Sequence, residues 1–335
     1  MKKNFLIAIM LLGTIITASA QQKPGMHLLA THKIQSDGGW DYLTIDGKNN
    51  NIYVSHGNQV NVLSKNGGDS VGVIHNTPGV HGIAIADPFG KGYTTNGKAG
   101  TCTVFDLRNF MIMATIKVGQ NPDAVFYDDF SKKVIVFNGK SSDAMIIDPA
   151  TDQVLSTIPL GGKPEAGVSD GKGKIYVNIE DTGEIVCFDS GNFKVLSRYK
   201  LKGGEEPSGL AIDRATSRLF TVCANKVMIV LDAKTGKHIT TLPIGDGSDG
   251  VVFDPATKMA YSSNGEGTIT AVKEVSADKF IVQETIRSEA GARTIALDPL
   301  THNIFLPTAT FEKSTDATQL PKRASGTFRV LEFGK

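Results

Sequence analysis

Four acidic side chains occupy equivalent places in the sequence and could act together on a cation or a proton. Each stands five residues before an aspartate that ends a short apolar segment, and they are Asp41, Asp123, Glu165 and Asp249. Arg293 holds the same position in the last such segment. Neighbouring carboxylates repel one another by roughly 1 kcal/mol in water and by more near protein. The pattern therefore predicts a bound cation, a retained proton or a cationic ligand.

Other polar residues are expected on the same face. Trp40 and His81 directly precede the equivalent position in their segments, and His56 and Asn264 end the apolar segment that follows. Asn264 also precedes a glycine, a pairing that equally favours a simple hairpin turn. We predict a ligand site that consists of Trp40, Asp41, His56, His81, Asp123, Glu165, Glu180, Asp249, Asn264, Glu266 and Arg293.

These residue types allow two kinds of chemistry. Carboxylate and amide oxygens suit Ca²⁺ or Mg²⁺, whereas imidazole would favour Zn²⁺; the expected metal ligands are Asp41, Asp123, Glu165 and Asp249. In one interpretation the site binds a small molecule, peptide or glycan without turnover, with Trp40 as an aromatic anchor. In the other, a metal-dependent hydrolase, lactonase or lyase would use His56 or His81 as a base and Arg293 to hold an anionic group.

A repeat of about 40 residues positions all of these side chains. The aspartates that end the apolar segments are spaced 41, 41, 42, 43, 41 and 44 residues apart, and they are Asp46, Asp87, Asp128, Asp170, Asp213, Asp254 and Asp298. Each is followed by a turn and further short apolar runs. Four short strands per repeat at this period are typical of propeller blades. The sequence predicts an all-β, seven-bladed β-propeller in which these aspartates cap turns on the face opposite the site.

The two ends of the chain predict how the ring closes. The last repeat has only three strands, and MHLLATHKI at 26–34 matches the missing outer strand. We expect the N-terminal strand to complete the last blade, which leaves no exposed sheet edge. The long insertion at 308–326 falls on the face of the predicted site and is expected to be a lid or a recognition loop.

Several repeats resemble one bacterial family. The segments IYVSH, GYTTN and IYVNI, together with WDYLTID, EEPSGLAID and GARTIALDPLTH, are similar to those of the YncE-like, YVTN-repeat seven-bladed propellers. The resemblance spans the chain after the first twenty residues. It implies the fold but no particular reaction, since the family includes binding proteins and proposed DNA binders.

The first twenty residues predict export. Lys2 and Lys3 precede an apolar run that ends at Ala18-Ser19-Ala20, the pattern of a signal peptide cleaved after Ala20. We expect residues 21–335 to form one domain in the periplasm or outside the cell, as a monomer without a membrane span.

Charge and composition exclude other classes. Loss of both leader lysines leaves 33 basic against 34 acidic residues, so nucleic acid is not an expected partner and the lysines are expected on the solvated surface. Trp40 is the single tryptophan and no nucleotide motif occurs, so neither a quinone nor a nucleotide cofactor is indicated. Cys102, Cys187 and Cys223 lie in apolar segments and are expected to be small buried residues.

Overall fold

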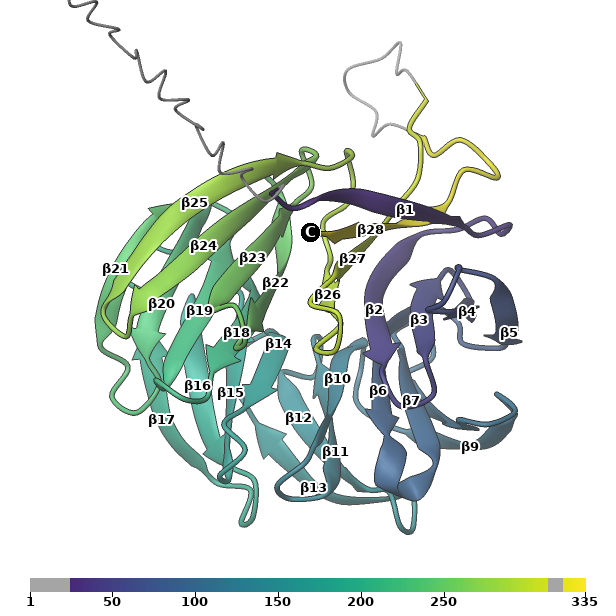
Figure 1. Cartoon of the computed structure of the whole chain (residues 1–335). Helices are drawn as coiled ribbons and strands as arrows, with labels where there is room; N and C mark the ends of the chain where they lie inside the picture. Colours follow the sequence, from purple (N-terminus) through teal and green to yellow (C-terminus); the bar gives the residue numbers. More distant parts are fainter. Residues whose placement is uncertain (1–24, 313–321) are drawn as a thin grey trace, which may run out of the picture.

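The computed structural model describes residues 25–312 and 322–335 and confirms the seven-bladed propeller. Seven four-stranded antiparallel sheets are arranged as a ring (Figure 1). Blade 1 comprises β2 (Trp40–Asp46), β3 (Asn51–His56), β4 (Gln59–Ser64) and β5 (Ser70–Ile74). Blade 2 comprises β6 (Val80–Ala86), β7 (Lys91–Asn96), β8 (Thr101–Asp106) and β9 (Ile112–Lys117). Blade 3 comprises β10 (Pro122–Asp128), β11 (Lys133–Asn138), β12 (Asp143–Asp148) and β13 (Gln153–Pro159). A single 3₁₀ turn, η1 (Asp87–Phe89), lies between β6 and β7.

The remaining blades repeat this order. Blade 4 comprises β14 (Pro164–Ser169), β15 (Lys174–Ile179), β16 (Glu184–Asp189) and β17 (Val195–Lys200). Blade 5 comprises β18 (Pro207–Asp213), β19 (Arg218–Cys223), β20 (Val227–Asp232) and β21 (His238–Pro243). Blade 6 comprises β22 (Ser248–Asp254), β23 (Met259–Asn264), β24 (Thr268–Ser276) and β25 (Lys279–Arg287). Blade 7 combines β26 (Ala296–Leu297), β27 (Ile304–Thr308) and β28 (Arg329–Gly334) with β1 (His27–Lys33). In the described part of the chain, no helix is long and apolar enough to cross a membrane.

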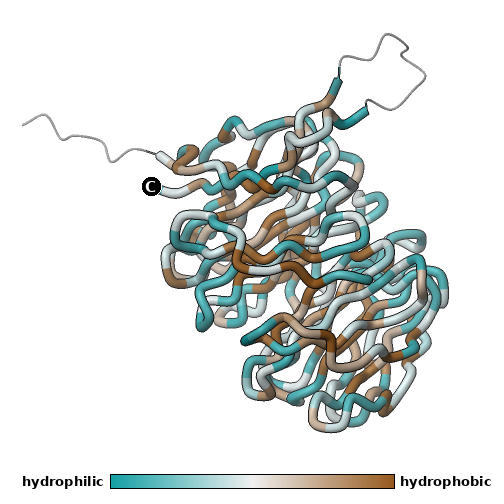
Figure 2. Tube along the Cα trace, turned by 90° about the vertical axis from the view of Figure 1, so that its right-hand side faces the viewer, coloured by the Kyte–Doolittle hydropathy of each residue, from teal (hydrophilic) through white to brown (hydrophobic). Residues whose placement is uncertain are grey.

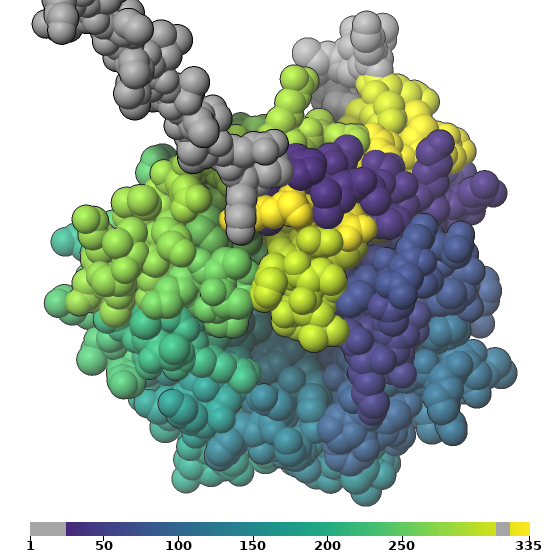
Figure 3. Space-filling view, in the orientation of Figure 1, coloured from purple at the N-terminus to yellow at the C-terminus, as the bar shows by residue number. Residues whose placement is uncertain are grey.

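The N-terminal strand closes the ring as the sequence predicts. β1 pairs antiparallel with β28, from His27 opposite Gly334 to Lys33 opposite Arg329. In the space-filling view the purple N-terminal segment lies against the yellow C-terminal one (Figure 3). The last blade thereby gains its outer strand, and the edge of β28 is covered.

The core lies between blades. Seven hydrophobic clusters of described residues each join two neighbouring blades. At the junction of blades 7 and 1, Phe305 and Val330 pack with Trp40 and Ile52. Figure 2 shows the same division, with brown apolar segments inside the layers and teal segments at many of the connecting turns.

A bulge near the start of the innermost strand in each of blades 1 to 6 turns the predicted site residues of these blades toward the channel mouth. The pairing of inner and second strands shifts register at the residues that include Asp41, Asp123, Glu165 and Asp249. Hydroxyl groups of the second strand satisfy the displaced backbone: Ser55 Oγ accepts from Asp41 N at 3.1 Å, and Thr95 Oγ1 accepts from Gly82 N at 2.8 Å. Bulges commonly re-aim side chains beside functional sites.

The aspartates at the ends of the inner strands have the predicted structural role. Asp46, Asp213 and Asp298, for example, each accept a hydrogen bond from the backbone N–H two residues later. Asp87 differs because it is the first residue of η1, and its carboxylate instead pairs with Lys48.

A buried ion pair crosses the junction where the ring closes. Lys65 Nζ of blade 1 lies 2.7 Å from Asp298 Oδ2 of blade 7, and the two side chains are 9% and 0% exposed. Burial alone would raise the pKa of Asp298, but the bonds from Lys65 and the Thr301 hydroxyl hold the pKa below its ordinary value.

Replacing Lys65 should therefore destabilise the fold strongly. Lys65→Met leaves the Asp298 carboxylate buried without its cation, which typically costs about 3–5 kcal/mol. The matched control is Lys48→Met, which removes an exposed pair with Asp87 and should cost about 1 kcal/mol or less. Urea-induced unfolding measures both, and equal losses in the two variants would contradict a special role for the buried pair.

Candidate functional site

A polar cavity of about 290 Å³ opens at the channel mouth. Its walls are Asp41, Tyr42, His81, Asp123, Lys163, Glu165, Glu180, Ser208, Asp249 and Arg293. The cavity brings together seven of the eleven residues that the sequence predicts: Asp41, His81, Asp123, Glu165, Glu180, Asp249 and Arg293. They come from six different blades, so only the closed ring assembles them.

The other four predicted residues lie elsewhere. Trp40 is buried against Phe328, with ring centroids 5.4 Å apart, and His56 lines a separate cavity. Asn264 is fully buried and donates from Nδ2 to the hydroxyls of Thr268 and Thr270, and Glu266 accepts from Thr268. Asn264 thus supports its own blade.

Asp41, His81 and Asp123 form the tightest group in the cavity. His81 Nδ1 lies 2.6 Å from Asp41 Oδ2 and 3.8 Å from Asp123 Oδ1. One ligand atom from each residue lies within 4.8 Å of the other two, a spacing that could hold a metal ion. Three consecutive blades supply them through the bulges at the starts of β2, β6 and β10.

Two cations balance the remaining acids. Arg293 pairs with Asp249, and its Nη2 lies 3.6 Å from Asp41 Oδ1. Lys163 Nζ lies 2.8 Å from Glu165 Oε1 and also pairs with Glu180. Lys163 corrects the expectation that lysines are only surface charges. The sequence signal that could have found Lys163 is its place two residues before Glu165, directly before β14.

Burial and mutual repulsion raise the pKa values of the acids. Burial, reinforced by Asp41, raises the pKa of Asp123 to about 7. Burial and Asp123 raise the pKa of Glu165 to about 9, and burial raises that of Asp249 to about 6 despite Arg293. Burial would lower the pKa of His81, but Asp41 and Asp123 raise it above its ordinary value. At neutral pH the mouth therefore retains protons that exposed carboxylates would lose.

The cysteines take no part in this site. Cys102, Cys187 and Cys223 are buried free thiols, as predicted, and burial raises the pKa of each. A raised pKa disfavours the thiolate, which is the reactive form.

The comparisons with known proteins identify the architecture. No family model matches the sequence, and no curated protein matches it. Among solved structures, a chain of hydrazine synthase from Kuenenia stuttgartiensis superposes with a TM-score of 0.70 at 14% identity. The match covers 88% of this chain and 96% of that one. At this identity the similarity establishes a shared seven-bladed propeller fold alone.

The raised pKa of Asp123 should make stability depend on pH. A carboxyl group whose pKa is higher in the folded state stabilises fully at low pH, and this contribution is lost as the pH rises through about 7. Asp123→Asn removes the cost of ionising this buried group in the folded state. The stability of the variant relative to the wild type should therefore rise between pH 5 and pH 8, by on the order of 1 kcal/mol or more.

Asp246→Asn is the control, since Asp246 is an exposed acid whose pKa is lowered by Lys226. Thermal melts across this pH range measure all three proteins. If the melting temperature of Asp123→Asn relative to the wild type stays constant or falls as the pH rises, Asp123 does not have a raised pKa in the folded protein.

Proposed function

We propose that this protein binds a divalent transition-metal ion at the channel mouth through Asp41, His81 and Asp123. The observation that carries the proposal is the convergence of one imidazole nitrogen and two carboxylate oxygens within 4.8 Å. A mixed nitrogen and oxygen set favours Zn²⁺ over Ca²⁺ or Mg²⁺, which prefer oxygen alone.

The proposal narrows the predicted ligand set. Glu165 and Asp249 were expected as metal ligands, but they pair with Lys163 and Arg293. Their role is then to hold these two cations at the rim. Because a metal ion would displace the proton between His81 and Asp41, its affinity should rise with pH.

Enzymatic hydrolysis is a second candidate because three protein ligands leave a coordination position open, as catalytic zinc sites do. Bound metal would polarise a carbonyl or acidify a water molecule there. Arg293, whose side chain is 44% exposed, could bind an anionic group of a substrate, and Glu165, whose pKa is raised by burial and Asp123, could donate a proton. His56 lies outside this cavity and His81 would hold the metal, so neither of the two predicted histidines would serve as a general base.

We also propose that the protein is an exported member of the YVTN-repeat family. The support is the repeat sequence and the leader pattern of residues 1–20, which lie outside the described residues. Expression of the full chain in a Gram-negative host should yield periplasmic protein that begins at Gln21, as intact mass would show. Retention of the leader would contradict this assignment.

Titration calorimetry of tag-free protein with Zn²⁺ tests the metal site. We expect one ion per chain, tighter binding at pH 7.5 than at pH 6, and weaker binding of Ca²⁺. Asp41→Asn and His81→Gln should each reduce the affinity by about 10-fold or more.

Asp246→Asn serves as the control and should bind like the wild type. Melting curves confirm that each variant is folded. Zinc binding that survives both substitutions, or that tightens as the pH falls, would overturn the proposed ligand set, whereas tighter Ca²⁺ binding would overturn the choice of metal.

A further inference from the structure

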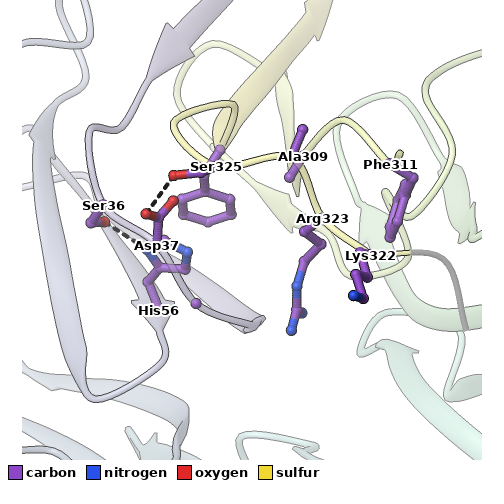
Figure 4. A pocket seen from close by; sticks show the side chains of 11 residues that line it. Ser36, Asp37, His56, Ala309, Phe311, Lys322, Arg323 and Ser325 are labelled. Carbon is purple, nitrogen blue, oxygen red and sulfur yellow. Dashed lines mark hydrogen bonds between the residues drawn. The ribbon is translucent and has the colours of Figure 1, made fainter. Parts of the chain in front are cut away.

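A second cavity, of about 760 Å³, lies where the loop between β1 and β2 meets the insertion of blade 7. Figure 4 shows two facing walls, with Ser36, Asp37 and His56 on one side and Lys322 and Arg323 on the other. The acidic metal site and this cavity share none of their lining residues.

Hydrogen bonds fix the insertion segments beside the cavity. Glu312 N donates to Lys322 O at 2.7 Å, and Ala324 N donates to Thr310 O at 2.8 Å. Asp37 joins these segments to the loop before β2, since its carboxylate accepts from Ser325 Oγ at 2.7 Å and from Gly326 N at 2.9 Å. Asp37 is therefore already engaged by two neutral donors, which lower its pKa.

His56 lies behind this wall and adds no charge to it. Its side chain is 1% exposed, its ring stacks on Phe328 at a centroid distance of 3.8 Å, and its Nδ1 lies 2.6 Å from Ser36 Oγ. Burial lowers the pKa of His56 to about 4, so the ring is neutral at physiological pH. Within residues 25–312 and 322–335, its Nε2 has no hydrogen-bond partner.

The opposite wall carries two positive charges. The side chains of Lys322 and Arg323 extend toward the same open space (Figure 4). The Arg323 guanidinium lies over the Trp40 ring at 5.4 Å, a stacking arrangement that leaves its N–H edge for an anion. Among the described residues that line the cavity, Asp37 is the one carboxylate, and Ser325 and Gly326 already donate to it.

We propose that this cavity binds a small organic anion. Lys322 and Arg323 bind its carboxylate or phosphate-ester head group, for which a guanidinium offers paired donors. Phe311, which is partly exposed in the same cavity, packs against its apolar body. His56 is neutral, and the Asp37 carboxylate already accepts two hydrogen bonds, so the positive charges of Lys322 and Arg323 determine the charge that the cavity prefers.

Calorimetric titration of protein freed of metal on a chelating resin tests the proposal, since a bound metal ion could otherwise hold the anion elsewhere. The probes are benzoate, phenyl phosphate, inorganic phosphate and uncharged benzamide. We expect one molecule of benzoate or phenyl phosphate per chain, and the tighter of the two identifies the preferred head group. Binding should weaken at least fivefold in Arg323→Gln and in Lys322→Gln.

Arg108→Gln is the matched control, because it removes the same charge from an exposed turn where Arg108 pairs with Asp106. It should leave binding unchanged. Lys322→Gln keeps the test decisive if loss of the Trp40 contact unfolds Arg323→Gln.

Three results would overturn the proposal. These are no binding of either organic anion up to about 10 mM, equal binding of benzamide or inorganic phosphate, and equal weakening in the Arg108 control.

Discussion

Each blade buries its faces only against its two neighbours, so the stability of every blade depends on a closed ring. The seven interblade clusters make this dependence visible, because none of them lies within one blade. At the closing junction, three separate contacts bring the ends of the chain together. β1 covers β28, Lys65 pairs with Asp298, and the Thr294 hydroxyl donates to the Asp41 carbonyl at 2.6 Å.

The same closure assembles the channel mouth. Asp41 and Arg293, which meet across the junction, are separated by almost the whole described chain. A ring that opened here would part Arg293 from Asp41 and separate the first blade from the last. Folding and the formation of the mouth are therefore one event, and mutations far from the cavity can act on it by loosening the junction.

Much of this arrangement follows from the sequence because the repeat fixes the backbone. Once the seven aspartates define the ends of the inner strands, the residues five positions earlier must lie at one mouth. The bulge near the start of the inner strand in blades 1 to 6 cannot be read from periodicity, yet it determines which side chains of these blades face the channel.

The remaining features depend on packing that the repeat does not encode. Trp40 precedes the mouth residue Asp41, and His56 pairs with Trp40 across the two strands. Both side chains turn away from the mouth, and Phe328 from the far end of the chain packs against both. Lys163 looked like a surface charge because its partners, Glu165 and Glu180, belong to two different strand ends. The insertion of blade 7 was expected on the face of the predicted site. Its described residues line the second cavity.

The residues around the mouth also break the near-sevenfold symmetry of the ring. Around the mouth, blades 1 to 3 supply Asp41, His81 and Asp123, blade 4 supplies Glu165 with its partner Lys163, and blade 5 supplies the neutral Ser208. Blades 6 and 7 then add the pair of Asp249 and Arg293. A guest on the central axis would meet acidic, basic and neutral groups in an unequal order around the ring. The mouth therefore distinguishes the rotational orientation of its guest, although the backbone around it is nearly symmetric.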